Sequence, residues 1–178
     1  MFGKYMSQTR HCTGVCYVSE NQQNNIRISA KAIIIHHEKI LLIKYRSESD
    51  EWFTLPGGGQ LFGEPLTQTL IRECREESRY EITPGELVFI REYIGKNHEF
   101  ADFDRDVHQL EMMFLATLLD NESDMLHLDI HSDRHQIAAQ WIDLAALEQT
   151  PLFPAALRSL IKEKKFPPLS PVYLGDVN

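Results

Sequence analysis

Residues 58–80 read GGQLFGEPLTQTLIRECREESRY, and this stretch decides how the surrounding sequence is interpreted. Its glycines break a short apolar strand predicted at 52–55, because glycine adopts backbone conformations that strands do not use. A helix is predicted from about Pro65 to Ser78. Proline suits the first helical position, and Glu64 just before it suits the positive end of the helix dipole. The stretch therefore predicts a strand, a glycine turn and a helix in succession.

Three carboxylates lie along one side of the predicted helix. At ~100° per residue, Glu73, Glu76 and Glu77 fall within a stripe about 100° wide. A neighbouring apolar stripe should pack against a sheet; it is formed by Leu66, Leu70, Ile71 and Cys74. Like charges at this spacing cost a few tenths of a kcal/mol per pair, and a divalent cation offsets that cost. Carboxylate oxygens suit Mg²⁺, so the pattern favours a magnesium site over a solvated acidic helix face.

These residues resemble the Nudix box, whose pattern is G-x5-E-x7-R-E-U-x-E-E-x-G-U, where U is an aliphatic residue. Gly58 and Glu64 stand at its first two fixed positions, and the pairs 72–73 and 76–77 supply its arginine and glutamates. The resemblance implies an α/β fold, specifically an α/β/α sandwich around a mixed sheet. It also implies a Mg²⁺-dependent pyrophosphohydrolase, with Mn²⁺ as an alternative ion, that cleaves a nucleoside diphosphate linked to another moiety.

The resemblance also implies roles for individual residues. Arg72 matches an arginine that orients a glutamate through a salt bridge, and Glu64 matches a glutamate that supports the geometry between loop and helix. The glycine carbonyl that often joins the metal ligands corresponds to one of two neighbouring residues here. The residues matched to metal binding are Glu73, Glu76, Glu77, Gly57 and Gly58.

One position departs from the family pattern. The glycine that follows the acidic pair is replaced by Arg79. Glycine there suits a left-handed turn at the end of the helix, and a non-glycine residue in that conformation costs on the order of 1 kcal/mol. We therefore expect the helix to end differently in this chain, without loss of the metal site.

Short apolar runs and alternating apolar residues predict the other elements. The expected strands are 26–35, 40–43, 52–55, 87–90, 107–119 and 140–142. The first two should form a hairpin around a polar turn at 36–39. Asp143 should cap a short helix, and Pro154 should open a last helix that runs to about Lys165. Residues 97–106 and 121–134 are predicted as loops.

The length of 178 residues fits one domain. We predict a weakly structured segment at 1–25, a domain at 26–165 and an extended tail at 166–178. The net charge of −8 disfavours duplex nucleic acid but not a phosphorylated small molecule. An odd number of cysteines, three, fits a reducing compartment, and the apolar runs are too short for a membrane span. With no signal-peptide pattern, the expected location is the cytoplasm.

Candidates outside the helix carry less weight. Glu111 and His98 are predicted to contact substrate, and Glu111 is also a candidate general base, as is Asp133. Asp102, Asp104 and Asp106 alternate in a loop and are candidates for an extra cation, against the alternative of a solvated acidic loop. A second candidate is a zinc site of residues that recur every four positions, which would need a helix, whereas the apolar alternation at 126–130 favours extended chain; its members are His127, His131 and His135.

Three functions stay open at this level. The first is the active diphosphohydrolase, and the second is a sensor that binds a nucleotide ligand on the same fold without cutting it. The third, removal of a 5′ diphosphate from RNA, is disfavoured by the acidic charge. The intact acidic set favours the first, with a nucleotide-derived small molecule as substrate. A homodimer is kept open.

Overall fold

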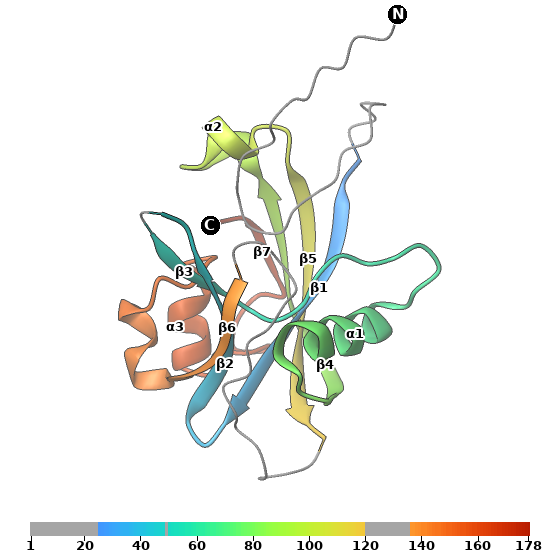
Figure 1. Cartoon of the computed structure of the whole chain (residues 1–178), viewed down its shortest axis with the longest axis vertical. Helices are drawn as coiled ribbons and strands as arrows, with labels where there is room; N and C mark the ends of the chain where they lie inside the picture. The colour runs from blue at the N-terminus through green and yellow to red at the C-terminus, as the bar shows by residue number, and fades with distance from the viewer. Residues whose placement is uncertain (1–24, 49, 120–135) are drawn as a thin grey trace, which may run out of the picture.

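The computed structural model describes residues 25–48, 50–119 and 136–178 (Figure 1). In chain order the elements are β1 (Arg27–His36), β2 (Lys39–Arg46), β3 (Glu51–Thr54), α1 (Leu66–Ser78), β4 (Ile82–Ile94), the 3-10 helix η1 (Gly95–Asn97), α2 (Ala101–Asp104), β5 (His108–Leu118), β6 (Gln136–Asp143), the 3-10 helix η2 (Leu144–Gln149), α3 (Leu157–Lys162) and β7 (Tyr173–Asp176). The strands form one sheet in the order β3-β2-β1-β5-β4-β7, and β6 pairs with β2. The pairs β1–β5 and β4–β7 are parallel, so the sheet is mixed as predicted.

Helices cover both faces of the sheet. Each strand contributes side chains to both faces, because successive residues of a strand point to opposite sides. On β1, Ala30 and Ala32 pack in one core cluster with Leu70 and Cys74 of α1. Ile33, next along the same strand, packs in a second cluster around η2 and α3; its members on those elements are Leu144, Leu147, Leu157 and Ile161. Figure 1 shows α1 and α3 on either side of the strands. The predicted α/β/α sandwich is confirmed.

The predicted hairpin joins β1 and β2 through a two-residue turn. His37 and Glu38 both have positive φ, 47° and 58°, as a tight hairpin turn with the right-handed twist of its strands requires. Beyond this turn the strands pair antiparallel only through Ile35 with Ile40 and His36 with Lys39. The first half of β1 is therefore available for another partner.

That partner is the loop that leads into α1. The Ala32 N–H donates to Pro56 O at 2.8 Å, the Ala30 N–H to Gly58 O at 3.0 Å, and the Gln60 N–H to Ile28 O at 3.0 Å. These bonds run along the first half of β1, like those of an added antiparallel strand. The loop is thus fixed to the centre of the sheet before the helix begins.

Some predictions about the periphery were wrong. The loop predicted at 97–106 contains part of η1 and the short helix α2. Within the tail predicted at 166–178, the residues Tyr173–Asp176 form β7 beside β4. The last helix is shorter than predicted and covers Leu157–Lys162. The predictions for residues 1–24 and for the loop 121–134 lie outside the described residues. No helix in the described part is long and apolar enough to cross a membrane.

Candidate active site

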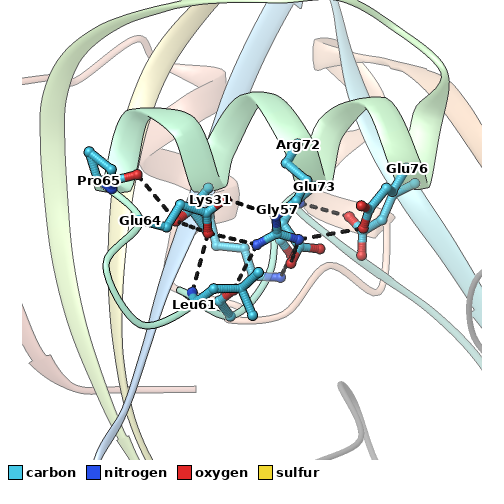
Figure 2. A network of polar contacts seen from close by, with 11 residues as sticks. Lys31, Gly57, Leu61, Glu64, Pro65, Arg72, Glu73 and Glu76 are labelled. Carbon is cyan, nitrogen blue, oxygen red and sulfur yellow. Dashed lines mark hydrogen bonds and ion pairs between the residues drawn. The ribbon is translucent and has the colours of Figure 1, made fainter.

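Arg72 lies at the centre of a polar network between α1 and the loop before it (Figure 2). Its Nε and Nη2 donate to the two carboxylate oxygens of Glu64, both at 2.9 Å, and Nη2 also donates to Gly59 O at 3.1 Å. Glu64 further accepts from the Thr69 hydroxyl at 2.8 Å and the Leu61 N–H at 3.2 Å. These bonds lower the pKa of Glu64 to about 2, and the hydrogen bonds from Arg72 contribute most. The network clamps the loop onto the helix.

The same guanidinium reaches the acidic stripe. Arg72 Nη1 donates to Glu73 Oε1 at 2.6 Å and lies 3.5 Å from Glu76 Oε2. The side chain of Glu73 is 16% exposed, whereas that of Glu76 is 54% exposed. Figure 2 shows Glu73 over the glycine loop and Glu76 farther along the helix. Arg72 therefore compensates part of the repulsion within the stripe and restrains Glu73 most strongly.

Glu77 and Glu73 each face one glycine of the loop. Glu77 is buried, and its Oε2 accepts a 2.7 Å hydrogen bond from the Gly57 N–H. Gly57 has φ +128°, and a Cβ there would lie 2.1 Å from Ala30 O. At Gly58 a Cβ would lie 2.4 Å from Glu73 Oε2. Gly57 thus permits the close approach of the loop to β1, and Gly58 permits its close approach to Glu73 on the helix.

The two glycine carbonyls have different partners. Gly58 O accepts from Ala30 N–H and is part of the pairing with β1. Gly57 O instead accepts a hydrogen bond from the side-chain ammonium of Lys31, the next residue on β1. Of the two carbonyls considered as metal ligands, only that of Gly57 is free of strand pairing. A positive charge already lies against it.

Both ends of α1 differ slightly from the prediction. Pro65 is the N-cap rather than the first helical residue, and its carbonyl accepts from the N–H groups of Gln68 and Thr69. At the other end Arg79 adopts the left-handed conformation, with φ 64° and ψ 5°, and its N–H donates to Arg75 O at 3.0 Å. The expectation of a different helix end was wrong. An exposed arginine occupies the conformation that glycine would take.

Comparison with known proteins gives the family. A family profile described as NUDIX domain matches residues 26–163. The chain belongs to the Nudix family. This confirms the resemblance found in the box, and family membership supports a Nudix-type pyrophosphohydrolase. No curated protein sequence matches the chain.

Solved structures share the Nudix fold at low sequence identity. A NUDIX hydrolase from Nitrosomonas europaea is 17% identical with a TM-score of 0.60, covering 79% of this chain and 88% of that one. An ADP-ribose pyrophosphatase from Streptococcus suis is 18% identical with a TM-score of 0.55, covering 85% and 98%. A MutT NUDIX hydrolase from Burkholderia pseudomallei is 22% identical with a TM-score of 0.57, covering 75% and 95%. At these identities the likeness shows the fold alone.

The Nudix box offers oxygen ligands that fit a hard divalent cation. No group of three or more His, Cys, Asp and Glu side chains in the described part of the chain is placed to hold one ion. Mg²⁺ does not need such a cage, because it keeps several waters and is usually held by one or two carboxylates. Glu73 and Glu77 lie against adjacent glycines, and the Gly57 carbonyl is beside them. The two carboxylates and the Gly57 carbonyl, which already accepts from the Lys31 ammonium, form a donor set that suits Mg²⁺.

Glu111, predicted to contact substrate, takes part in a buried ion pair. Its Oε2 accepts from Arg91 Nη1 at 2.8 Å, and the two side chains are 10% and 7% exposed. Its Oε1 accepts from Gln109 Nε2 at 3.1 Å. The register partner of Glu111 on β1 is Ser29, which in turn bridges to Gly59. One strand therefore separates Glu111 from the glycine loop.

His98, the other predicted substrate contact, is tied to the C-terminal strand. Its Nε2 lies 2.5 Å from Asp176 Oδ1, and its ring stacks on Tyr93 with centroids 5.1 Å apart. Asp176 also accepts from the Ile94 N–H at 2.9 Å and from Asn97 Nδ2 at 2.7 Å. Partial burial raises the pKa of Asp176, but the hydrogen bonds to its carboxylate outweigh burial and lower the pKa to about 2. In this arrangement the imidazole serves to hold β7 beside β4.

Among the remaining candidates that the structure describes, Asp104 has a partner on β4. Asp104 is buried and accepts a 2.9 Å hydrogen bond from the Tyr93 hydroxyl. Burial is the main cause that raises the pKa of this carboxyl. Asp133 and the three histidines at 127, 131 and 135 lie outside the described residues. Sequence reasoning missed Lys31, which stands between Ala30 and Ala32 where the alternating part of the strand meets its apolar run.

Proposed function

We propose that the protein hydrolyses the diphosphate linkage of a nucleoside diphosphate joined to another moiety, in a Mg²⁺-dependent reaction. The observation that carries the proposal is the placement of the Glu73 and Glu77 carboxylates against Gly58 and Gly57. It gathers buried negative charge and a carbonyl oxygen on one edge of α1. Such oxygen donors suit an ion that also takes phosphate oxygens.

The box residues have separable tasks in this proposal. Glu73 and Glu77 hold the ion with the Gly57 carbonyl, and Glu76, which is half exposed, completes the set from the solvent side. Arg72 positions Glu73, and Glu64 fixes Arg72 through two hydrogen bonds of 2.9 Å. When bound, a divalent cation neutralises phosphate charge and lowers the pKa of water.

A general base must lie within hydrogen-bond reach of the attacking water. Glu111 is held by Arg91 and Gln109, which leaves neither of its oxygens without a donor. Among the described residues, the carboxylates of the box are therefore the better candidates. Glu76 reaches solvent most, and its contact with Arg72 is long at 3.5 Å.

The substrate class is supported by chemistry rather than by likeness to one relative. A neighbour named as an ADP-ribose pyrophosphatase acts on a nucleoside diphosphate derivative by that name. At 18% identity this likeness shows only that the fold is shared. The proposal therefore names a substrate class rather than one compound. Hydrolysis would release two phosphorylated products from each molecule of substrate.

A substrate panel tests the proposal directly. Nucleoside triphosphates, ADP-ribose, dinucleoside polyphosphates and nucleotide sugars are incubated with the protein and Mg²⁺, and nucleotide and phosphate release are measured. The expected result is hydrolysis of at least one compound, abolished by EDTA and restored by Mg²⁺ or Mn²⁺. Tight nucleotide binding with no hydrolysis across the panel would instead establish the sensor.

A further inference from the structure

Lys31 is a basic side chain that reaches the glycine loop from β1. Its ammonium donates to Gly57 O, the carbonyl that strand pairing leaves available, while the N–H of the same glycine donates to Glu77. Gly58, the next residue, faces the carboxylate of Glu73. Figure 2 shows Lys31 reaching Gly57.

A carbonyl that accepts a hydrogen bond from an ammonium is not a free metal ligand. A lysine ammonium is compact and sits on a flexible four-carbon stem, so it can leave one acceptor for another nearby. Phosphate oxygens are strong acceptors for such a group. In a diphosphate hydrolase they would be brought to this edge of α1.

We propose that Lys31 is an internal cation that competes with the divalent ion for the Gly57 carbonyl and, once displaced, contacts a phosphate oxygen of the substrate. The inference rests on the proposed function. It makes Lys31 a positioning residue in the metal-free protein and a substrate contact in the loaded one. In the absence of substrate, Lys31 lowers the affinity of the site for the divalent ion. When substrate binds, the Lys31 ammonium donates to a phosphate oxygen in place of the Gly57 carbonyl.

The test compares Lys31→Met with the wild-type protein and with two controls. Lys31→Arg keeps the charge, and Lys39→Met removes a charge from a half-exposed lysine at the far end of the hairpin, paired with Asp143 at 3.7 Å. Mn²⁺ binding to the metal-free proteins is measured by electron paramagnetic resonance, and KM and kcat are measured separately on the substrate found in the panel. Circular dichroism checks the fold of every variant.

We expect Lys31→Met to bind Mn²⁺ on the order of tenfold more tightly, because a competing hydrogen bond to a charged group is removed. Its KM should rise by about tenfold or more for the lost phosphate contact. Lys31→Arg and Lys39→Met should bind Mn²⁺ as the wild type does. A purely structural tie predicts unchanged or weaker Mn²⁺ binding in Lys31→Met, and this result would overturn the inference.

Failure of this inference differs from failure of the proposed function. If the wild type binds Mn²⁺ and hydrolyses a substrate while Lys31→Met matches it in both, only the role of Lys31 is wrong. If the wild type neither binds Mn²⁺ nor hydrolyses any compound, the proposed function fails and the role of Lys31 fails with it.

Discussion

The Glu77 carboxylate accepts a 2.7 Å hydrogen bond from the Gly57 N–H and so joins the last turn of α1 to the glycine loop. The carbonyl of the same glycine faces Lys31. One residue of the loop therefore contacts an anionic group through its N–H and a cationic group through its oxygen. The position of this residue is fixed by β1, because the neighbouring carbonyls of Pro56 and Gly58 accept from its N–H groups.

Replacing Glu77 tests the metal role of the box. Glu77→Gln keeps an oxygen for the Gly57 N–H but removes the negative charge. We expect turnover to fall by more than about 100-fold, since changes even to groups outside the direct ligands of a metal cost 10–100-fold. Turnover is measured with Mg²⁺ on the substrate from the panel. The matched control is Glu86→Gln, at an exposed position of β4, and wild-type turnover in Glu77→Gln would refute the role.

The two glycines should respond differently to alanine. In Gly57→Ala the new Cβ meets Ala30 O at 2.1 Å with φ at +128°, and backbone on both sides cannot yield. We expect a loss of unfolding free energy of roughly 2 kcal/mol or more. In Gly58→Ala the Cβ meets the Glu73 side chain, which can move. Gly58→Ala should therefore unfold near the wild-type midpoint and still lose most of its activity.

Denaturant unfolding and turnover, measured on both alanine variants, separate these outcomes. Equal losses of stability in the two would contradict the contacts described for the loop. Full activity in Gly58→Ala would show that the position of Glu73 is not critical.

Local patterns predicted the elements that carry the site, and long-range pairing accounts for what they missed. The helix 66–78 is marked by its apolar and acidic stripes, so its position follows from periodicity. β7 has four residues, includes Gly175 and gains its partner only by pairing with a strand some eighty positions earlier in the chain. A short glycine-containing strand has little local signal.

The same reasoning explains the candidate residues. Glu111 looked available as an acidic residue on a strand, but its partner Arg91 becomes apparent only from the register of β4 against β5. Likewise His98 is paired with Asp176, which is 78 positions away. The box glutamates needed no such information, because a single helix brings them to one edge.

The pairing of Glu64 with Arg72 should appear in the acid dependence of stability. The pKa of Glu64 is lowered from 4.5 to about 2 in the folded protein, first by its hydrogen bonds from Arg72. Because the folded value is depressed, this contribution is complete above the unfolded pKa and is lost as the pH falls from about 4.5 to about 2. Asp176, whose pKa is lowered from 3.8 to about 2, adds a separate contribution that is lost as the pH falls from about 3.8 to about 2.

The variant Glu64→Gln isolates the first contribution. Its thermal midpoint should lie below that of the wild type at pH 6, and the difference should shrink steadily as the pH approaches 2. Glu86→Gln, measured in parallel, should follow the wild-type curve. Parallel curves for Glu64→Gln and wild type over this range would show that the pair does not stabilise the fold.

Arg79 gives the last prediction, because it holds a left-handed conformation with an exposed side chain. Glycine would remove the clash of Cβ with the backbone, worth about 1 kcal/mol, but would add flexibility to the unfolded chain. We expect Arg79→Gly to be more stable by about 0.5 kcal/mol and to melt roughly 1–2 °C higher. Arg79→Ala is the matched control, since it removes the charge and keeps the Cβ. An equal rise in both variants would assign the gain to the lost charge, and no rise in Arg79→Gly would mean that the helix end carries no strain.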